Sequence, residues 1–260
     1  MERDAMNSQS IQSPGKYNAR RDRRFWIALL ILCAIGAAAA TRRIVALGTA
    51  PVAGSSEFAG LDAHFAAKAA ITLLHIVPSL LFVLLVPLQF VSSLRRRRPR
   101  LHRWMGRVIV GLGVVLGTSA LWLSAHPVGG LAEGTATIFF GCFFLFSLGK
   151  AWWHIRNGRV QLHREWATRM TAIALGVATT RPIMGVFFAT RRLTGLTPHQ
   201  FFGPAMWLGL VSTYLAGEAW VNYTRSRTTK NRSEESPYLT EKSRATARHP
   251  IEGVGSTYKR

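Results

Sequence analysis

The chain has 260 residues, of which 48% are hydrophobic and 17% are charged, and its formal net charge is +21. A soluble domain this basic would indicate a nucleic-acid partner. Here the Lys and Arg residues stand between long apolar runs instead of being spread over amphipathic elements, so we expect no nucleic acid and favour a membrane protein.

Six apolar runs follow one another along the chain. They span residues 25–47, 66–90, 104–125, 131–153, 167–190 and 201–223. Each is close to the roughly 20 residues that a helix needs to cross the hydrocarbon core, and helices satisfy their own backbone hydrogen bonds in lipid. The first run is interpreted as an uncleaved anchor, with a cleaved signal peptide as the alternative. The sequence therefore predicts an all-α integral membrane bundle of six transmembrane helices over residues 25–223.

The two ends of the chain differ from this domain in composition. Residues 1–24 are polar and basic, and residues 224–260 are rich in Ser, Thr, Arg, Lys and Glu. Such segments cannot bury enough apolar surface to fold, so we predict a disordered leader and a disordered tail.

The distribution of basic residues predicts the orientation. The leader, residues 95–107, residues 150–169 and the tail hold 27 of the 33 Lys and Arg residues. Segments rich in Lys and Arg stay in the cytoplasm. We therefore predict that both termini are cytoplasmic and that the protein lies in the cell's inner (cytoplasmic) membrane.

Two ionisable residues lie deep inside predicted spans, where such residues are functional candidates. His75 and Arg181 each lie about nine residues, or ~14 Å, from the outer end of their helices. Pro78 and Pro182 stand near them, and a proline inside a helix frees a backbone carbonyl and kinks the helix. The interpretation is a shared ligand pocket between the second and fifth spans, with a packing kink as the alternative.

Two cytoplasmic segments resemble each other, LHRWMGR at 101–107 and LHREWATR at 162–169. Their histidines, His102 and His163, lie at matching depth on different helices and could ligate a b-type haem. Trp and Arg are also ordinary interface anchors that hold anionic lipid headgroups. The predicted anchors are Arg95, Arg96, Arg97, Arg98, Arg103, Trp104, Arg107, Arg164, Trp166 and Arg169.

Two further features concern the helices themselves. Glu218 is an acid in the last span, predicted to pair with Arg107, Arg164 or Arg169. Gly113 and Gly117 have the GxxxG spacing of helix packing. No metal site is predicted, and the sequence has none of the motifs GxSxG, HExxH or GxGxxG.

These residues resemble a known family. A helix with a mid-membrane His75 that ends in PLQF (87–90) is followed by a basic loop and LHRWMGR, then by a second HRxW segment, an Arg-Pro in the fifth span and an acid in the last. The pattern is similar to the bacterial membrane proteins of domain-of-unknown-function family 2306, over about residues 60–223. Glu165 and Ala167, on either side of Trp166, depart from the family pattern. The resemblance implies the fold and assigns no activity.

Three functional hypotheses remain open, and the sequence assigns no catalytic residue, enzymatic activity or oligomeric state. The protein binds or moves a small anionic or protonatable ligand at His75 and Arg181. Alternatively it is a redox protein with haem b held by His102 and His163. Alternatively it is a structural protein whose partners are the bilayer and its anionic headgroups.

Overall fold

The computed structural model describes residues 14–48 and 59–248, and their side chains over 22–48, 62–197 and 199–229. All regular structure in these ranges is helical, which confirms the all-α prediction. The helices are α1 (Pro14–Gly48), α2 (Ala59–Ala66), α3 (Ala69–Phe90), α4 (Ser92–Arg97), α5 (Pro99–Leu123), α6 (Gly130–Arg156), α7 (Val160–Thr194) and α8 (Pro198–Arg248).

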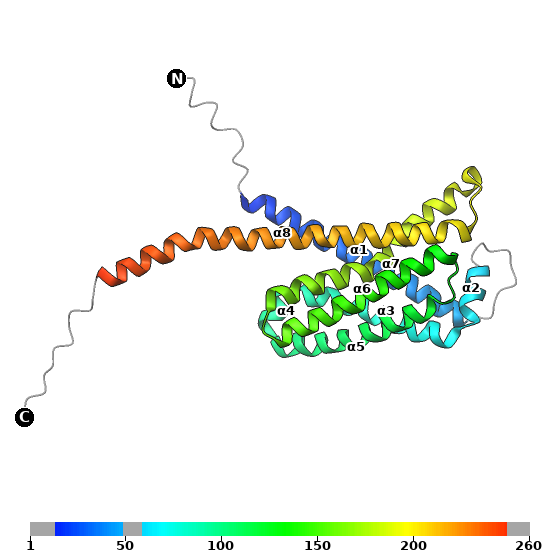
Figure 1. Ribbon diagram of the computed structural model, residues 1–260, viewed down its shortest axis with the longest axis horizontal. Coiled ribbons are helices and arrows are strands. Elements are labelled where there is room, and N and C mark those ends of the chain that lie inside the picture. The colour runs from blue at the N-terminus through cyan, green and yellow to red at the C-terminus, as the bar shows by residue number, and fades with distance from the viewer. Residues whose placement is uncertain (1–13, 49–58, 249–260) are drawn as a thin grey trace, which may run out of the picture. The chain divides into compact units, whose positions relative to one another are not determined.

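Five long helices form a closed ring. α1 packs on α3, α3 on α5, α5 on α6, α6 on α7, and α7 returns to α1. The short helices mark opposite ends of this bundle, α4 at one end and α2 at the other (Figure 1). We call these the α4 end and the α2 end. Phe82 of α3 and Phe144 of α6, both buried, meet inside the ring with centroids 6.0 Å apart.

Five helical segments are long and apolar enough to cross a membrane in the described part of the chain. They are Asp22–Gly48, Ala69–Phe90, Pro99–Leu123, Gly130–Arg156 and Val160–Thr194. The sixth predicted span, 201–223, lies within α8 and is not among them. It contains Pro204, Ser212, Thr213 and Glu218, which make it more polar than the other five.

Helix extends beyond the predicted spans at both ends of the chain. α1 begins at Pro14 and α8 continues to Arg248, so parts of the predicted leader and tail are helical. Arg, Lys and Glu are good helix formers and allow a helix to continue past the apolar segment. Residues 1–13 and 249–260 of those predictions lie outside the described residues. The chain divides into two units, residues 1–216 and residues 217–260.

Glycines let neighbouring helices approach closely. A Cβ added at Gly117 of α5 would lie 2.5 Å from Leu145 Cδ2 of α6, and one at Gly113 would lie 3.0 Å from Leu148 Cδ2. The GxxxG segment therefore packs against α6, as its spacing predicts. A Cβ at Gly209 of α8 would lie 2.5 Å from Thr180 Cγ2 of α7, which makes a second contact of small residues.

Candidate functional site

An ion-pair network holds α2 against the end of α1. Arg42 Nη2 lies 3.0 Å from Asp62 Oδ2, and Arg43 bonds the other carboxylate oxygen of Asp62. The guanidinium of Arg43 also lies over the ring of Phe65, 4.3 Å from its centroid. Because the carboxylate and the ring fix its position, Arg43 can be buried although it is charged.

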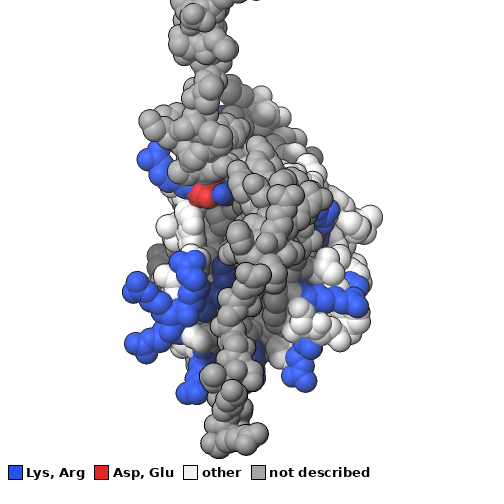
Figure 2. Space-filling model, turned by 90° about the vertical axis from the view of Figure 1, so that its left-hand side faces the viewer, with Lys and Arg blue, Asp and Glu red and all other residues white. Residues whose placement is uncertain are grey.

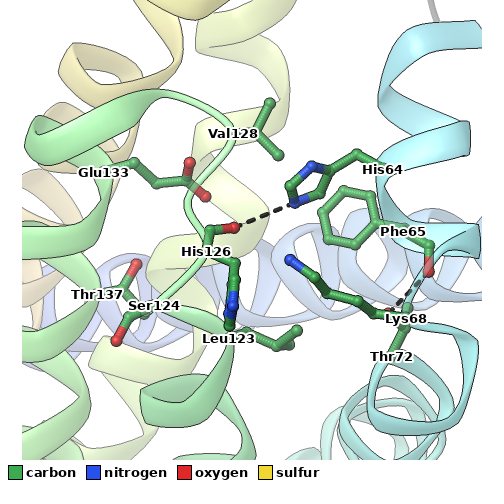
Figure 3. A pocket seen from close by; sticks show the side chains of 10 residues that line it. All are labelled: His64, Phe65, Lys68, Thr72, Leu123, Ser124, His126, Val128, Glu133 and Thr137. Carbon is green, nitrogen blue, oxygen red and sulfur yellow. Dashed lines mark hydrogen bonds between the residues drawn. The ribbon is translucent and has the colours of Figure 1, made fainter.

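A cavity of about 50 Å³ lies beside this network. Residues from α2, α3, the end of α5, α6 and the loops that follow α2 and α5 line it: His64, Phe65, Lys68, Thr72, Leu123, Ser124, His126, Val128, Glu133 and Thr137. Figure 3 shows the Lys68 amine and the His64 ring pointing inward, with His64 Nε2 3.1 Å from the carbonyl oxygen of His126. The volume suits a few waters or one small ion.

Glu133 is the acidic group of the cavity. The backbone N–H of Gly129 donates to its Oε2 at 2.6 Å, which anchors the carboxylate to the first turn of α6. Arg181 of α7 lies within electrostatic range of Glu133, Arg43 and Arg42. Arg181 makes no hydrogen bond or ion pair with any other described residue, and its side chain is exposed at the molecular surface.

His75 lies one turn inward from the cavity. Thr72 lines the cavity, and His75 follows it by three residues on the same face of α3. Nδ1 of His75 lies 2.9 Å from Oγ of Ser119 on α5. Ser79 Oγ, beside Pro78, donates to the backbone carbonyl of His75 at 2.5 Å.

The ring order bears on the predicted pocket of His75 and Arg181. α1 lies between α3 and α7, and a Cβ at Gly36 of α1 would lie 3.6 Å from Val83 Cγ1 and 3.7 Å from Ala178 Cβ. Pro182 stands within α7, next to Arg181. No contact between His75 and Arg181 occurs among the described side chains, and the shared pocket stays a prediction.

The histidines of the two similar segments lie at the α4 end. His102 is within electrostatic range of His163 and Arg95. His163 Nδ1 lies 2.8 Å from the backbone carbonyl of Ala151 and so donates to it. A third histidine, His154 of α6, is 5% exposed and within electrostatic range of His163. Among the described residues, no three His, Cys, Asp or Glu side chains could hold a metal ion. The haem prediction stays a prediction.

The predicted interface anchors lie at this end too. Trp104 is 60% exposed, and Trp166 packs on Phe146 with centroids 5.5 Å apart. Arg169 Cζ lies 4.8 Å from the centroid of Trp166, and Arg169 forms an ion pair with Glu165 at 3.9 Å. Figure 2 looks onto the α4 end and shows groups of Lys and Arg with little acidic surface.

Arg95 of α4 lies within electrostatic range of two other arginines, Arg96 and Arg164. Partial burial lowers the pKa of the Arg95 guanidinium, and the neighbouring charges of Arg164 and Arg96 lower it further.

The predicted acid Glu218 belongs to the second unit of the chain, and its pairing stays a prediction.

Sequence reasoning missed several residues of these sites. Asp62, Lys68 and Glu133 at the α2 end, and Gln89 and His154 at the α4 end, were not predicted. The sequence did contain a signal for Glu133, because it is the only acidic residue between Asp62 and Glu165. The partners of the others come from distant parts of the chain and cannot be found from local spacing.

The long apolar helices and the polar groups between them define the class: this is an all-α, multi-pass membrane protein. The family described as predicted membrane protein (DUF2306) matches residues 72–221. The chain therefore belongs to this family, which confirms the resemblance that its motifs indicate. No curated protein and no solved structure matches the chain.

Proposed function

We propose that the protein binds a small anion at the α2 end of its membrane bundle, beside Arg181. The observation that carries this proposal is the position of Arg181 within a span, near two other arginines and without a hydrogen bond among the described residues. Charged side chains within spans are costly and rare, and they commonly mark ligand, ion or proton sites.

The charges around Arg181 support an anion over a cation. The basic side chains of this region outnumber the acidic ones: Arg42, Arg43, Lys68 and Arg181 against Asp62 and Glu133. Asp62 is shared by Arg42 and Arg43, and Glu133 accepts a hydrogen bond from the backbone. A bound anion would offset the remaining positive charge, in surroundings where water screens it less than in bulk solution.

Arg181 does not line the cavity but lies within electrostatic range of Glu133, which does, and the size of the cavity restricts the ligand. About 50 Å³ accommodates a halide or a small oxyanion such as nitrate or formate. His75, one turn further in, is the next polar group along α3 and would meet a ligand or a proton that moved inward. Pro78 would then kink α3 and Pro182 would kink α7, the two helices that pack on either side of α1.

The proposal includes an orientation. The basic residues favour a cytoplasmic α4 end and cytoplasmic termini in an inner membrane, so the anion site would face the opposite side. The arginines of the α4 end would then lie among anionic headgroups of the cytoplasmic leaflet.

Thermal unfolding of the purified protein, followed by tryptophan fluorescence, tests the anion site. Chloride, nitrate, formate and acetate are compared with bulky gluconate at equal ionic strength. A ligand at a concentration of about ten times its Kd should raise Tm by about 3–6 °C. Arg181→Gln should abolish this shift, whereas Arg192→Gln, a matched change of an exposed arginine on the same helix, should preserve it. An equal shift in both variants would contradict the proposal.

A further inference from the structure

The α4 end contains buried nitrogens without hydrogen-bond partners. In the described part of the chain, four buried side-chain polar atoms have no partner, and three of them lie at this end: Gln89 Nε2 of α3, His102 Nδ1 of α5 and His154 Nδ1 of α6. Each unsatisfied buried donor or acceptor costs about 1–3 kcal/mol. Native proteins tolerate few such groups, and a cluster of them calls for a ligand or ordered water.

The three side chains belong to one row across the bundle. A Cβ at Gly106 would lie 3.7 Å from Gln89 Oε1, and His102 lies one turn before Gly106 on the same face of α5. His163 of α7 is within electrostatic range of both His102 and His154. The three side chains and His163, which together form this row, therefore lie on α3, α5, α6 and α7 at the α4 end of the bundle.

Basic side chains surround the row. Arg95 and Arg103 are within electrostatic range of His102, and Lys150 and Arg159 are within range of His154. The nearby acid, Glu165, is engaged by Arg169. A metal cation would be repelled by these charges, whereas an anion would be attracted.

The donor set selects among anions. Amide and imidazole N–H groups, combined with guanidinium groups, match the several oxygens of a phosphate. Basic pockets between transmembrane helices at a membrane surface bind phosphate-bearing headgroups in the same way.

We infer that the α4 end holds a phosphate group, with Gln89, His102 and His154 as hydrogen-bond donors and Arg95 and Arg164 as counter-charges. The phosphate belongs either to an anionic phospholipid or to a soluble phosphate. This site is separate from the anion site at the α2 end and does not depend on it.

The test uses the full-length protein in delipidated detergent solution. Binding is followed by Tm and by native mass spectrometry with phosphatidylglycerol, phosphatidylcholine, inorganic phosphate and, as a control for charge screening, chloride. Phosphatidylglycerol alone raising Tm identifies a lipid headgroup, and inorganic phosphate doing so identifies a soluble ligand. Both results support the site. Equal shifts with chloride, or none at all, overturn it.

Variants separate this site from general screening of charge. Gln89→Leu removes a buried donor without adding a cavity, so without ligand the protein should be at least as stable as the wild type. Its affinity for the phosphate ligand should fall about tenfold. Arg164→Gln should weaken binding similarly, and Arg100→Gln, an exposed arginine at the same end, should not. Unchanged affinity in Gln89→Leu and Arg164→Gln would overturn the inference. A haem absorbance band that His102→Ala removes would also overturn it.

Discussion

His75 donates a hydrogen bond from Nδ1 to the hydroxyl oxygen of Ser119, 2.9 Å away on the neighbouring helix. The direction follows from Ser119 itself, whose single hydroxyl hydrogen is given to the backbone carbonyl of Val115 at 2.5 Å. The Nδ1 position of His75 therefore carries a proton. One bond thus ties α3 to α5 at the histidine below the cavity.

A double-mutant cycle checks this bond. His75→Ala and Ser119→Ala should each lower the free energy of unfolding, and their coupling energy should be about 0.5–1.5 kcal/mol, the value of one hydrogen bond. Thr118→Ala is the control, because Thr118 bonds only to its own helix. Coupling between His75→Ala and Thr118→Ala as large as that with Ser119→Ala would contradict the assignment.

Asp62 should matter for both stability and the proposed anion site. Asp62→Asn removes the charge that Arg42 and Arg43 share, so the free energy of unfolding should fall by about 1–2 kcal/mol. The same change leaves more uncompensated positive charge beside Arg181 and should tighten binding of the small anion. Measurements of Tm with and without nitrate give both quantities. Asp22→Asn, 20 residues before Arg42 on α1, should leave nitrate binding unchanged. Weaker nitrate binding in Asp62→Asn would contradict the charge argument.

The sequence predicted the elements well because a membrane restricts the choice of structure. Apolar length alone locates α3 and α6 to within three residues, whereas α5 and α7 begin five and seven residues before the predicted spans. The spacing of Gly113 and Gly117 predicts a packing face that the structure shows against Leu145 and Leu148. The family was recognised from the PLQF and LHRWMGR segments, because short polar motifs beside apolar runs are conspicuous.

The sites were predicted less well because their partners are remote in the sequence. Periodicity does not reveal that Asp62 reaches back to Arg42, or that His75 finds a serine 44 residues later. His75 and Arg181 were paired because each helix, taken separately, places them at the same depth in the membrane. The order of helices around the ring cannot be obtained in this way, and it places α1 between α3 and α7. Residues 201–223 were judged a span by length, although their polar residues distinguish them from the other five.

The contact between α7 and α8 should be sensitive to a single methyl group. A Cβ at Gly176 would lie 2.8 Å from Leu210 Cδ2 and 2.9 Å from Leu210 Cα, and the backbone atom cannot move aside cheaply. Gly176→Ala should therefore lower the free energy of unfolding by about 1–3 kcal/mol, although alanine is the better helix former. Gly185→Ala on the same helix meets nothing within 4 Å and should be neutral or stabilising. Equal Tm values for the two variants would show that the helices do not pack this closely.

The proposed orientation can be decided by labelling single cysteines. Cys33 and Cys142 are replaced by serine, and Asn157→Cys or Thr194→Cys is then introduced. Both positions are exposed and lie at opposite ends of the bundle: Asn157 just before the start of α7, and Thr194 at its end. Because the basic α4 end should face the cytoplasm, a membrane-impermeant maleimide should label Thr194→Cys in intact cells and Asn157→Cys only after the cells are opened. The reverse pattern would place the arginine-rich loops outside and move the proposed anion site to the cytoplasmic face. Labelling of both positions in intact cells would mean that α7 does not cross the membrane.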